Sequence, residues 1–182
     1  MTPRKGKRLV IDANIAHSAG FSDVQDSRYC RLSLDAVLDG DYVAVFNEAL
    51  RREWKDHLSR YSWTWQRSMV AQRRVEYAEG KEFAIYLDRA CSSLEHERWK
   101  DDLRKDFHLI QSALASGQTI LSLEKNFPKF VAIASLKVGE FSTLYYANPA
   151  SEGEGCVDWI KAGAEKIPNR RIDVWVRNHL KS

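Results

Sequence analysis

Residues 8–14 read RLVIDAN, a short apolar run that ends abruptly in an acidic and an amide residue. Three consecutive apolar residues bounded in this way suit a strand buried on both faces, as in a parallel sheet, better than a helix. Similar runs recur at residues 42–46 (YVAVF) and 119–123 (TILSL), and we expect a fourth strand at residues 141–146. Segments with helical patterns separate these runs. Strands that alternate with helices predict an α/β fold with a parallel sheet.

Start and stop signals bound some of the helical segments. Asn47 follows the second strand and can cap the helix after it, because its side-chain oxygen can accept a hydrogen bond from the first turn. Residues 63–115 contain no proline and a single glycine, so we expect two or three helices there, the last from about residue 103 to 116. Residues 150–156 are rich in glycine and glutamate and are expected to form an acidic loop.

The chain has the size of one domain. Its 182 residues fall within the usual range for a single hydrophobic core, and no linker or internal repeat interrupts the pattern of strands and helices. We therefore expect one three-layer α/β/α domain over residues 8–182, with a central, mostly parallel sheet. A basic N-terminal arm over residues 1–7 is expected to precede it.

Composition excludes several other classes of protein. Hydrophobic residues make up 44% of the chain and charged residues 29%, which is typical of a globular domain rather than of a disordered chain or a disulfide scaffold. The formal net charge is +3, and the cluster of Arg4, Lys5, Lys7 and Arg8 accounts for all of it. Any attraction to nucleic acid must therefore be local rather than a field of the whole protein.

Cysteine and hydropathy patterns bear on the cellular compartment. The chain has three cysteines, Cys30, Cys91 and Cys156, whose spacing matches no zinc or redox motif. We expect them to be free thiols in a reducing compartment. No apolar segment approaches the length of a membrane span or of the apolar region of a signal peptide. These features predict a cytoplasmic protein without membrane contact.

Acidic residues recur near the ends of the predicted strands. Asp12 ends the first strand, Glu53 lies about two turns into the helix after the second, Asp106 lies at the start of the helix that leads into the third, and Glu124 follows the third. Each alone has a structural explanation as a cap, a turn residue or a solvated charge. Together they would converge at the carboxyl edge of the sheet, where ligands of such folds bind. Clustered carboxylates repel one another and a divalent cation relieves the repulsion, so the sequence predicts a Mg²⁺ or Mn²⁺ site.

Three stretches around these acids are similar to motifs of the PIN-domain family. Residues 8–14 resemble its opening strand and Asp-x-Asn signature, and residues 46–54 (FNEALRREW) resemble its second motif. Residues 105–124 (KDFHLIQSALASGQTILSLE) are the most specific stretch. They resemble the family's unit of an Asp, a helix, a glycine and a strand, closed by a hydroxyl residue and an acid. The resemblance covers roughly residues 8–150.

The resemblance also distinguishes the residues within each motif. In the second motif it identifies Glu53 as the family acid and Glu48 as a helix-start residue. Ser122 matches a position where a hydroxyl residue commonly assists, and Asn14 and Ser122 would support the carboxylates or the phosphate by hydrogen bonds. The fourth acid of the family is usually Asp. Glu124 is longer by one methylene and can reach a metal directly or through water.

The function that the resemblance implies is endoribonuclease activity of a PIN-like fold, dependent on Mg²⁺ or Mn²⁺ and directed at single-stranded RNA. Asp12, Glu53, Asp106 and Glu124 would be both catalytic residues and metal ligands, and Glu53 would orient or deprotonate the attacking water. Small relatives of this kind are often the toxins of bacterial toxin–antitoxin pairs. The implied partners are therefore single-stranded RNA, an antitoxin protein and a second copy of the chain.

Residues 51–74 form a strip that contains seven basic residues and two acids, with Trp54, Tyr61, Trp63 and Trp65 interleaved. Basic groups for phosphates and aromatic rings for bases are what single-strand binding uses. Alternatively, the aromatic residues form core or a dimer interface while the arginines are solvated, and Trp54 is the residue most expected in the core. The arginines predicted to bind RNA are Arg51, Arg52, Arg60, Arg67, Arg73 and Arg74.

Two other functions stay open from the sequence. One is a PIN-like nuclease in RNA or DNA processing, or in defence, that has no antitoxin. The other is a non-catalytic PIN-like interaction module whose acids no longer bind metal. Histidine is not required for the chemistry, and His108 is expected to point to another face of its helix than Asp106 and to be structural.

Overall fold

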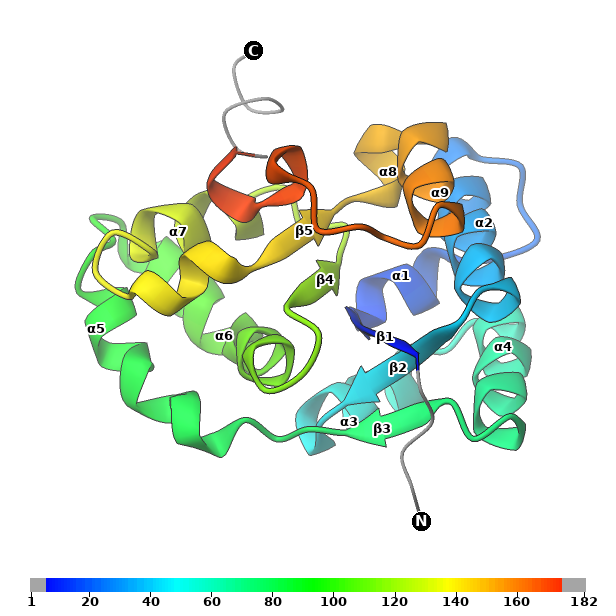
Figure 1. Ribbon diagram of the computed structural model, residues 1–182, viewed down its shortest axis with the longest axis horizontal. Coiled ribbons are helices and arrows are strands. Elements are labelled where there is room, and N and C mark those ends of the chain that lie inside the picture. The colour runs from blue at the N-terminus through cyan, green and yellow to red at the C-terminus, as the bar shows by residue number, and fades with distance from the viewer. Residues whose placement is uncertain (1–5, 175–182) are drawn as a thin grey trace.

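A five-stranded, all-parallel sheet forms the centre of the computed structural model, which describes residues 6–174 (Figure 1). The strand order is β3-β2-β1-β4-β5. The strands are β1 (Lys7–Ile11), β2 (Tyr42–Phe46), β3 (Val75–Tyr77), β4 (Thr119–Leu121) and β5 (Tyr145–Ala147). The predicted α/β class with a parallel sheet is confirmed.

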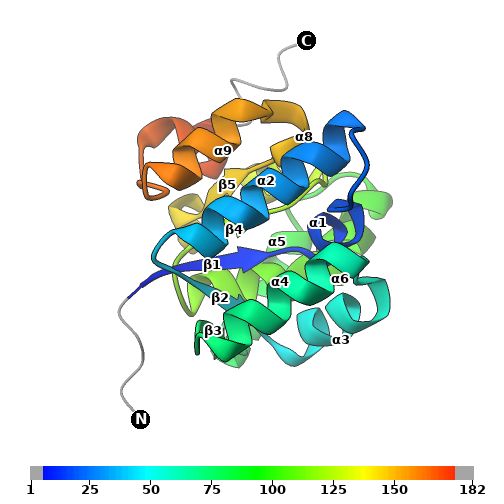
Figure 2. The ribbon, with the colours of Figure 1, turned by 90° about the vertical axis from the view of Figure 1, so that its right-hand side faces the viewer.

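Helices cover both faces of the sheet and make a three-layer α/β/α arrangement. In Figures 1 and 2, α2, α4, α8 and α9 lie on one face and α5, α6 and α7 on the other, while α1 and α3 lie near the carboxyl end of β1. The α-helices are α1 (Ala13–Ser18), α2 (Gln25–Asp39), α3 (Glu48–His57), α4 (Arg60–Ala71), α5 (Leu87–Cys91), α6 (Glu97–Leu114), α7 (Phe127–Ala134), α8 (Pro149–Glu152) and α9 (Glu154–Lys161). Shorter 3₁₀ helices are η1 (Lys81–Tyr86), η2 (Gly139–Thr143) and η3 (Pro168–Arg170).

The two central strands are apolar because helices cover both of their faces. Val10 of β1 lies between Val45 of β2 and Ile120 of β4 in the register of the sheet. All five residues of β2 and the last three of β1 are buried. A strand enclosed on both faces has no solvent-exposed side on which polar residues would be favoured, and this explains the continuous apolar runs in the sequence.

The strand order reverses at β1. From β1 the chain builds outward on one side through β2 and β3, and it then crosses to the other side of β1 to form β4 and β5. Outside the carboxyl ends of β1 and β4, this reversal leaves the crevice in which open α/β sheets bind their ligands. Asp12 directly follows β1 and Ser122 directly follows β4, so both stand at this crevice.

Two strand predictions are corrected by the structure. The edge strand Val75–Tyr77 was not predicted, because its three residues are half-buried or exposed and carry a central glutamate. The strand predicted at residues 141–146 is confined to Tyr145–Ala147. Its first part is instead η2, where the hydroxyls of Ser142 and Thr143 donate to the carbonyls of Gly139 and Glu140 and thereby favour a helical turn.

Two helix predictions also change. The helix expected from about residue 103 begins at Glu97, so Asp106 lies in its middle rather than at its start. Residues 150–156 are mostly helical rather than a loop. The Asn148 side chain accepts hydrogen bonds from the backbone N–H groups of Ala150 and Ser151 and caps α8, and Gly153, with a φ of +57°, separates α8 from α9.

The predicted basic arm lies largely outside the described residues. Of residues 1–7, Gly6 and Lys7 are described, and Lys7 belongs to β1, where it pairs with Tyr42. The first strand therefore begins one residue before the predicted start of the domain. None of the helices between residues 6 and 174 combines the length and the apolar surface needed to cross a lipid bilayer.

Candidate active site

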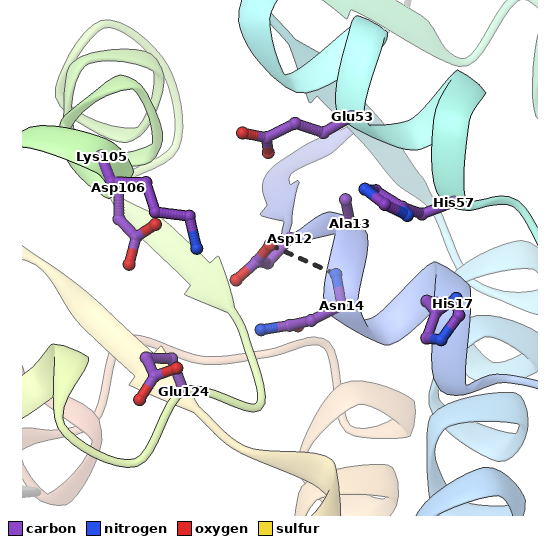
Figure 3. A pocket seen from close by; sticks show the side chains of 9 residues that line it. All are labelled: Asp12, Ala13, Asn14, His17, Glu53, His57, Lys105, Asp106 and Glu124. Carbon is purple, nitrogen blue, oxygen red and sulfur yellow. Dashed lines mark hydrogen bonds between the residues drawn. The ribbon is translucent and has the colours of Figure 1, made fainter. Parts of the chain in front are cut away.

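A cavity of about 380 Å³ opens at the carboxyl edge of the sheet, where the strand order reverses (Figure 3). Side chains from five parts of the fold reach it: the turn after β1, helices α1, α3 and α6, and the loop after β4. The structure thus brings the four acids singled out in the sequence around one space. The residues that line it are Asp12, Ala13, Asn14, His17, Glu53, His57, Lys105, Asp106 and Glu124.

Asp12 is the innermost of the acids and is held from two sides. It is the N-cap of α1, and its Oδ1 accepts a hydrogen bond from the backbone N–H of Asn14 at 3.3 Å. Its Oδ2 accepts a hydrogen bond from the Ser122 hydroxyl at 2.6 Å. Burial nevertheless raises the pKa of Asp12, since the two hydrogen bonds only partly offset the loss of water around the carboxylate.

Asn14 and Ser122 tie the start of α1 to the end of β4. The Asn14 amide donates to Ser122 Oγ at 3.2 Å, and its Oδ1 accepts from the backbone N–H of Leu123 at 3.1 Å. Ser122 Oγ also accepts from the backbone N–H of Glu124 at 3.1 Å. These bonds fix Asp12 and the backbone that carries Glu124 relative to each other. Ser122 bonds a carboxylate directly, whereas the Asn14 side chain bonds Ser122 and the backbone of Leu123.

Glu53 reaches the cavity because the residue after it is anchored in the core. Trp54 is fully buried, and its indole N–H donates to the carbonyl of Ile11 at 2.8 Å, one residue before Asp12. Asn47 caps α3 as predicted, accepting from the backbone N–H of Leu50 at 2.8 Å. The predicted core position of Trp54 is confirmed, and its indole bond sets the position of α3 against the end of β1.

Asp106 and Lys105 enter the cavity from α6. Burial raises the pKa of Asp106 to about 7, and the charge of Asp12 adds to the shift, while Lys105 opposes it. The Lys105 side chain extends into the cavity beside Asp106 (Figure 3). Without a further positive charge, the two innermost carboxyls are therefore difficult to ionise together.

His108 does not line the cavity, as expected, but it contacts Glu53 from the side. Its Nδ1 lies 3.0 Å from the carbonyl of Lys105, and since a carbonyl only accepts, Nδ1 carries the hydrogen. Its Nε2 lies 3.3 Å from Glu53 Oε2 without the alignment of a hydrogen bond. Burial disfavours the charged imidazole, but Glu53, the Lys105 carbonyl and Asp12 together outweigh burial and raise the pKa of His108. The contact in turn lowers the pKa of Glu53.

Glu124 is the most exposed of the acids. It follows Leu123 in the loop after β4, and its side chain points toward the cavity on the same side as Asp106 (Figure 3). Glu48, by contrast, is exposed at the first position of α3 and does not line the cavity, while its backbone N–H donates to Glu79. Of the two glutamates of α3, Glu53 therefore lines the cavity and Glu48 does not.

The donor set fits a hard divalent cation. Four carboxylates face one space, with no thiolate among them, and oxygen ligands of this kind suit Mg²⁺ or Mn²⁺ rather than zinc. Within residues 6–174, no three acidic, histidine or cysteine side chains are drawn together into a ready-made metal-binding group. Mg²⁺ is commonly held by one or two carboxylates and several waters, so the cavity fits it without such a group.

The predicted arginine strip divides into two groups. Arg51, Arg52, Arg60, Arg67 and Arg73 are exposed. Arg74 is buried, and its guanidinium donates to backbone carbonyls, so its predicted role in phosphate binding is wrong. Its donors satisfy the last carbonyls of α2, which the basic strip in the sequence did not reveal.

Three basic residues that line the cavity were not predicted as site residues. His57 stands four residues after Glu53, and this spacing puts both on one face of α3. His17 lies on the short helix α1, which begins directly after Asp12. Lys105 directly precedes Asp106 on α6. The helical spacing from Glu53 could have revealed His57, whereas His17 depends on how α1 packs against α3.

Comparisons of the chain with models of protein families, with curated proteins and with solved structures gave no match. The functional argument therefore starts from the geometry of the cavity.

Proposed function

We propose that the protein is a nuclease of the PIN type that hydrolyses phosphodiester bonds in single-stranded RNA with Mg²⁺ or Mn²⁺. The observation that carries the proposal is that Asp12, Glu53, Asp106 and Glu124 come from four separate segments and line one cavity. A fold gains no stability by turning acids toward one another, because burial and the charges of neighbouring carboxylates disfavour the ionised forms of Asp12 and Asp106. A bound cation supplies the missing reason for the arrangement.

Asp12 and Asp106 are the residues that would hold the cation, with Glu124 joining directly or through water. Both aspartates have a raised pKa from burial, which is the electrostatic state that a cation relieves. When bound, the metal lowers the pKa of a coordinated water and stabilises charge on the phosphate. Ser122 and Asn14 keep the Asp12 carboxylate in place through their hydrogen bonds.

Glu53 differs from the two aspartates and suits a different task. Its pKa is lowered by His108, so it is ionised and can accept a proton or hydrogen bond from an attacking water. His108 acts as a positioning residue that fixes the carboxylate from the side, at 3.3 Å. Lys105 extends into the cavity with a positive charge that suits a phosphate oxygen.

The biological setting proposed is that of a cytoplasmic toxin with an antitoxin partner, acting as a homodimer. The support is the resemblance of residues 8–14, 46–54 and 105–124 to the PIN-domain family. The three cysteines are free and buried, as suits a reducing compartment. Growth arrest on expression, relieved by the product of a neighbouring gene, distinguishes this setting from that of a nuclease without an antitoxin.

The test of the proposed activity is cleavage of a labelled single-stranded RNA by the purified chain. We expect cleavage with Mg²⁺ or Mn²⁺, none with EDTA, and recovery when metal is restored. Asp106→Asn is the matched inactive control, because it keeps the size of the side chain and removes its charge. If wild type and this variant are equally inactive with every divalent cation, the chain is a non-catalytic interaction module and the proposal is wrong.

A further inference from the structure

Two histidines of the cavity have not yet been given a role in binding. His17 and His57 lie on the side of the cavity opposite Asp106 and Glu124 (Figure 3). Their rings meet edge to face, with centroids 5.9 Å apart and planes at 84°. Both side chains are exposed, and neither forms a hydrogen bond or ion pair with the residues between 6 and 174. Their ring faces and N–H groups are therefore available to a ligand.

The histidine pair is held in place by the backbone around it. The backbone N–H and the hydroxyl of Ser59 donate to the carbonyls of Ala16 and Ala19, respectively, at the end of α1. The hydroxyl of Ser62 donates to the carbonyl of Ala16 at 2.6 Å. These bonds join the junction of α3 and α4 to α1. His57 ends α3 beside this junction, so the fold fixes the position of its backbone relative to α1, and its ring contacts that of His17.

Helix α4 continues from the same junction with an aromatic and basic surface. Arg60, Trp63 and Arg67 are spaced by three and four residues and share its exposed face, while Trp65 and Met69 on the other face are buried. Trp63 is 50% exposed, and the guanidinium of Arg67 lies 4.5 Å from the centre of its ring. A half-exposed indole beside a guanidinium offers a base a surface to stack on and a phosphate a cation to contact.

We infer that His17, His57, Trp63 and Arg67 form a binding site for single-stranded nucleic acid that leads from the carboxylates onto α4. The inference rests on the proposed function, because the carboxylates mark where the strand is cut. Aromatic rings stack on bases only when the bases are unpaired, which favours a single strand over a duplex. The charge is complementary to phosphate, because the exposed arginines of α3 and α4 outnumber the acids beside them.

The test measures binding separately from cleavage. The probes are a fluorescein-labelled oligouridylate of about 12 nucleotides and an RNA duplex of equal length, titrated by fluorescence anisotropy in EDTA. We expect wild type to bind the single strand and to prefer it to the duplex. Trp63→Ala should weaken single-strand binding at least about five-fold, the lower end of the contribution of one stacked base, and leave duplex binding unchanged.

Companion variants separate stacking, charge and position. Trp63→Phe keeps a ring and should restore most of the affinity, while His57→Ala should weaken single-strand binding as Trp63→Ala does. Arg67→Ala should also flatten the dependence of log K on log salt by about 0.7 per lost phosphate contact. Lys129→Ala is the matched control, because it removes a cation stacked 4.9 Å from another tryptophan, Trp99, and should change nothing.

Each other outcome overturns the inference. If wild type fails to bind the single strand, or if Trp63→Ala binds it with wild-type affinity, the inferred binding site is wrong. If a variant changes in molecular mass, measured by light scattering, but keeps its affinity for RNA, this face joins two copies of the chain. Failure of the proposed activity gives a different result: wild type would bind the oligouridylate as expected and yet cleave no RNA with Mg²⁺ or Mn²⁺.

Discussion

At the scale of single residues, the cavity combines carboxyls in opposite electrostatic states. Burial raises the pKa of Asp12 and Asp106, whereas His108 lowers the pKa of Glu53. Acids whose environments push their pKa values apart are suited to different tasks. The two aspartates are suited to a cation, and Glu53 to a water molecule.

Asp12→Asn and Asp106→Asn should each lower RNA cleavage at least about a hundred-fold, because loss of a ligand removes several kcal/mol of metal-assisted stabilisation of the transition state. The free energy of unfolding should stay the same or rise, since each change removes a repelled, buried charge, and Asn caps a helix as well as Asp does. Cleavage rates and urea unfolding measure the two effects.

Asp101→Asn is the control for both variants, because Asp101 lies on α6 like Asp106 but is exposed and paired with Arg104. It should keep the wild-type cleavage rate. If either cavity variant retained activity within a few-fold of wild type, the assignment of the metal ligands would be wrong.

Glu53→Gln should lower turnover by orders of magnitude, while Glu48→Gln should leave it nearly unchanged. Both glutamates lie on α3, but Glu53 lines the cavity and Glu48 is exposed at the start of the helix. Steady-state cleavage of one RNA by both variants measures the difference. The reverse ranking would show that Glu48 is the functional acid of this helix.

At the scale of elements, Arg74 shows how a basic residue distant in sequence can cap the C-terminus of a helix. Its guanidinium donates to the carbonyls of Val37, Leu38 and Gly40, at the C-terminus of α2, and to Tyr42 at the start of β2. A cation is also favourable at this end of a helix dipole. The residue therefore joins α2, β2 and the turn before β3.

Arg74→Ala should lower the free energy of unfolding by about 3 kcal/mol or more, because several buried carbonyls lose a charged donor. Arg73→Ala, at the exposed neighbouring position, should change it by less than about 0.5 kcal/mol. Chemical denaturation of both variants provides the measurement. Equal stability of the two would contradict the role assigned to Arg74.

Sequence patterns predicted the elements that bury a continuous apolar surface and missed those that depend on tertiary contacts. The strand at residues 42–46 and the one predicted at residues 119–123, which ends at Leu121, were identifiable because both of their faces are covered. The edge strand at residues 75–77 has no apolar run, since pairing with β2 alone holds it. Asp12 and Glu124 could be selected because they follow the apolar runs of strands, whereas Glu53 and Asp106 lie inside helices, and their choice depended on the resemblance of their segments to family motifs. The burial of Arg74 depends on contacts with distant backbone that no local pattern encodes.

At the scale of the whole molecule, the raised pKa of Asp106, about 7, makes stability depend on both pH and cations. The folded protein binds this proton more tightly than the unfolded chain, whose carboxyl titrates near 3.8. The contribution of Asp106 to stability is therefore full at low pH and is lost as the pH rises through about 7. A cation binds the ionised form and opposes the loss.

Mg²⁺ should therefore raise the thermal midpoint more at about pH 8 than at about pH 5, since protons compete with the cation at the lower pH. Asp106→Asn should reduce both the effect of Mg²⁺ and the loss of stability on raising the pH. Thermal scans with Mg²⁺ or EDTA at the two pH values measure this. A Mg²⁺ effect that is equal at both pH values, or equal in the variant, would contradict a cation at this carboxyl.

The strand order has a consequence for the chain during its synthesis. Asp12 and Glu53 leave the ribosome early, but Asp106 and Glu124 face them only after β4 has paired with β1 on the side away from β2. A nascent chain folds from its N-terminus, so the part that emerges first has no complete cavity. Any activity that needs all four acids can therefore begin only after residues 119–124 have been synthesised and β4 has paired with β1.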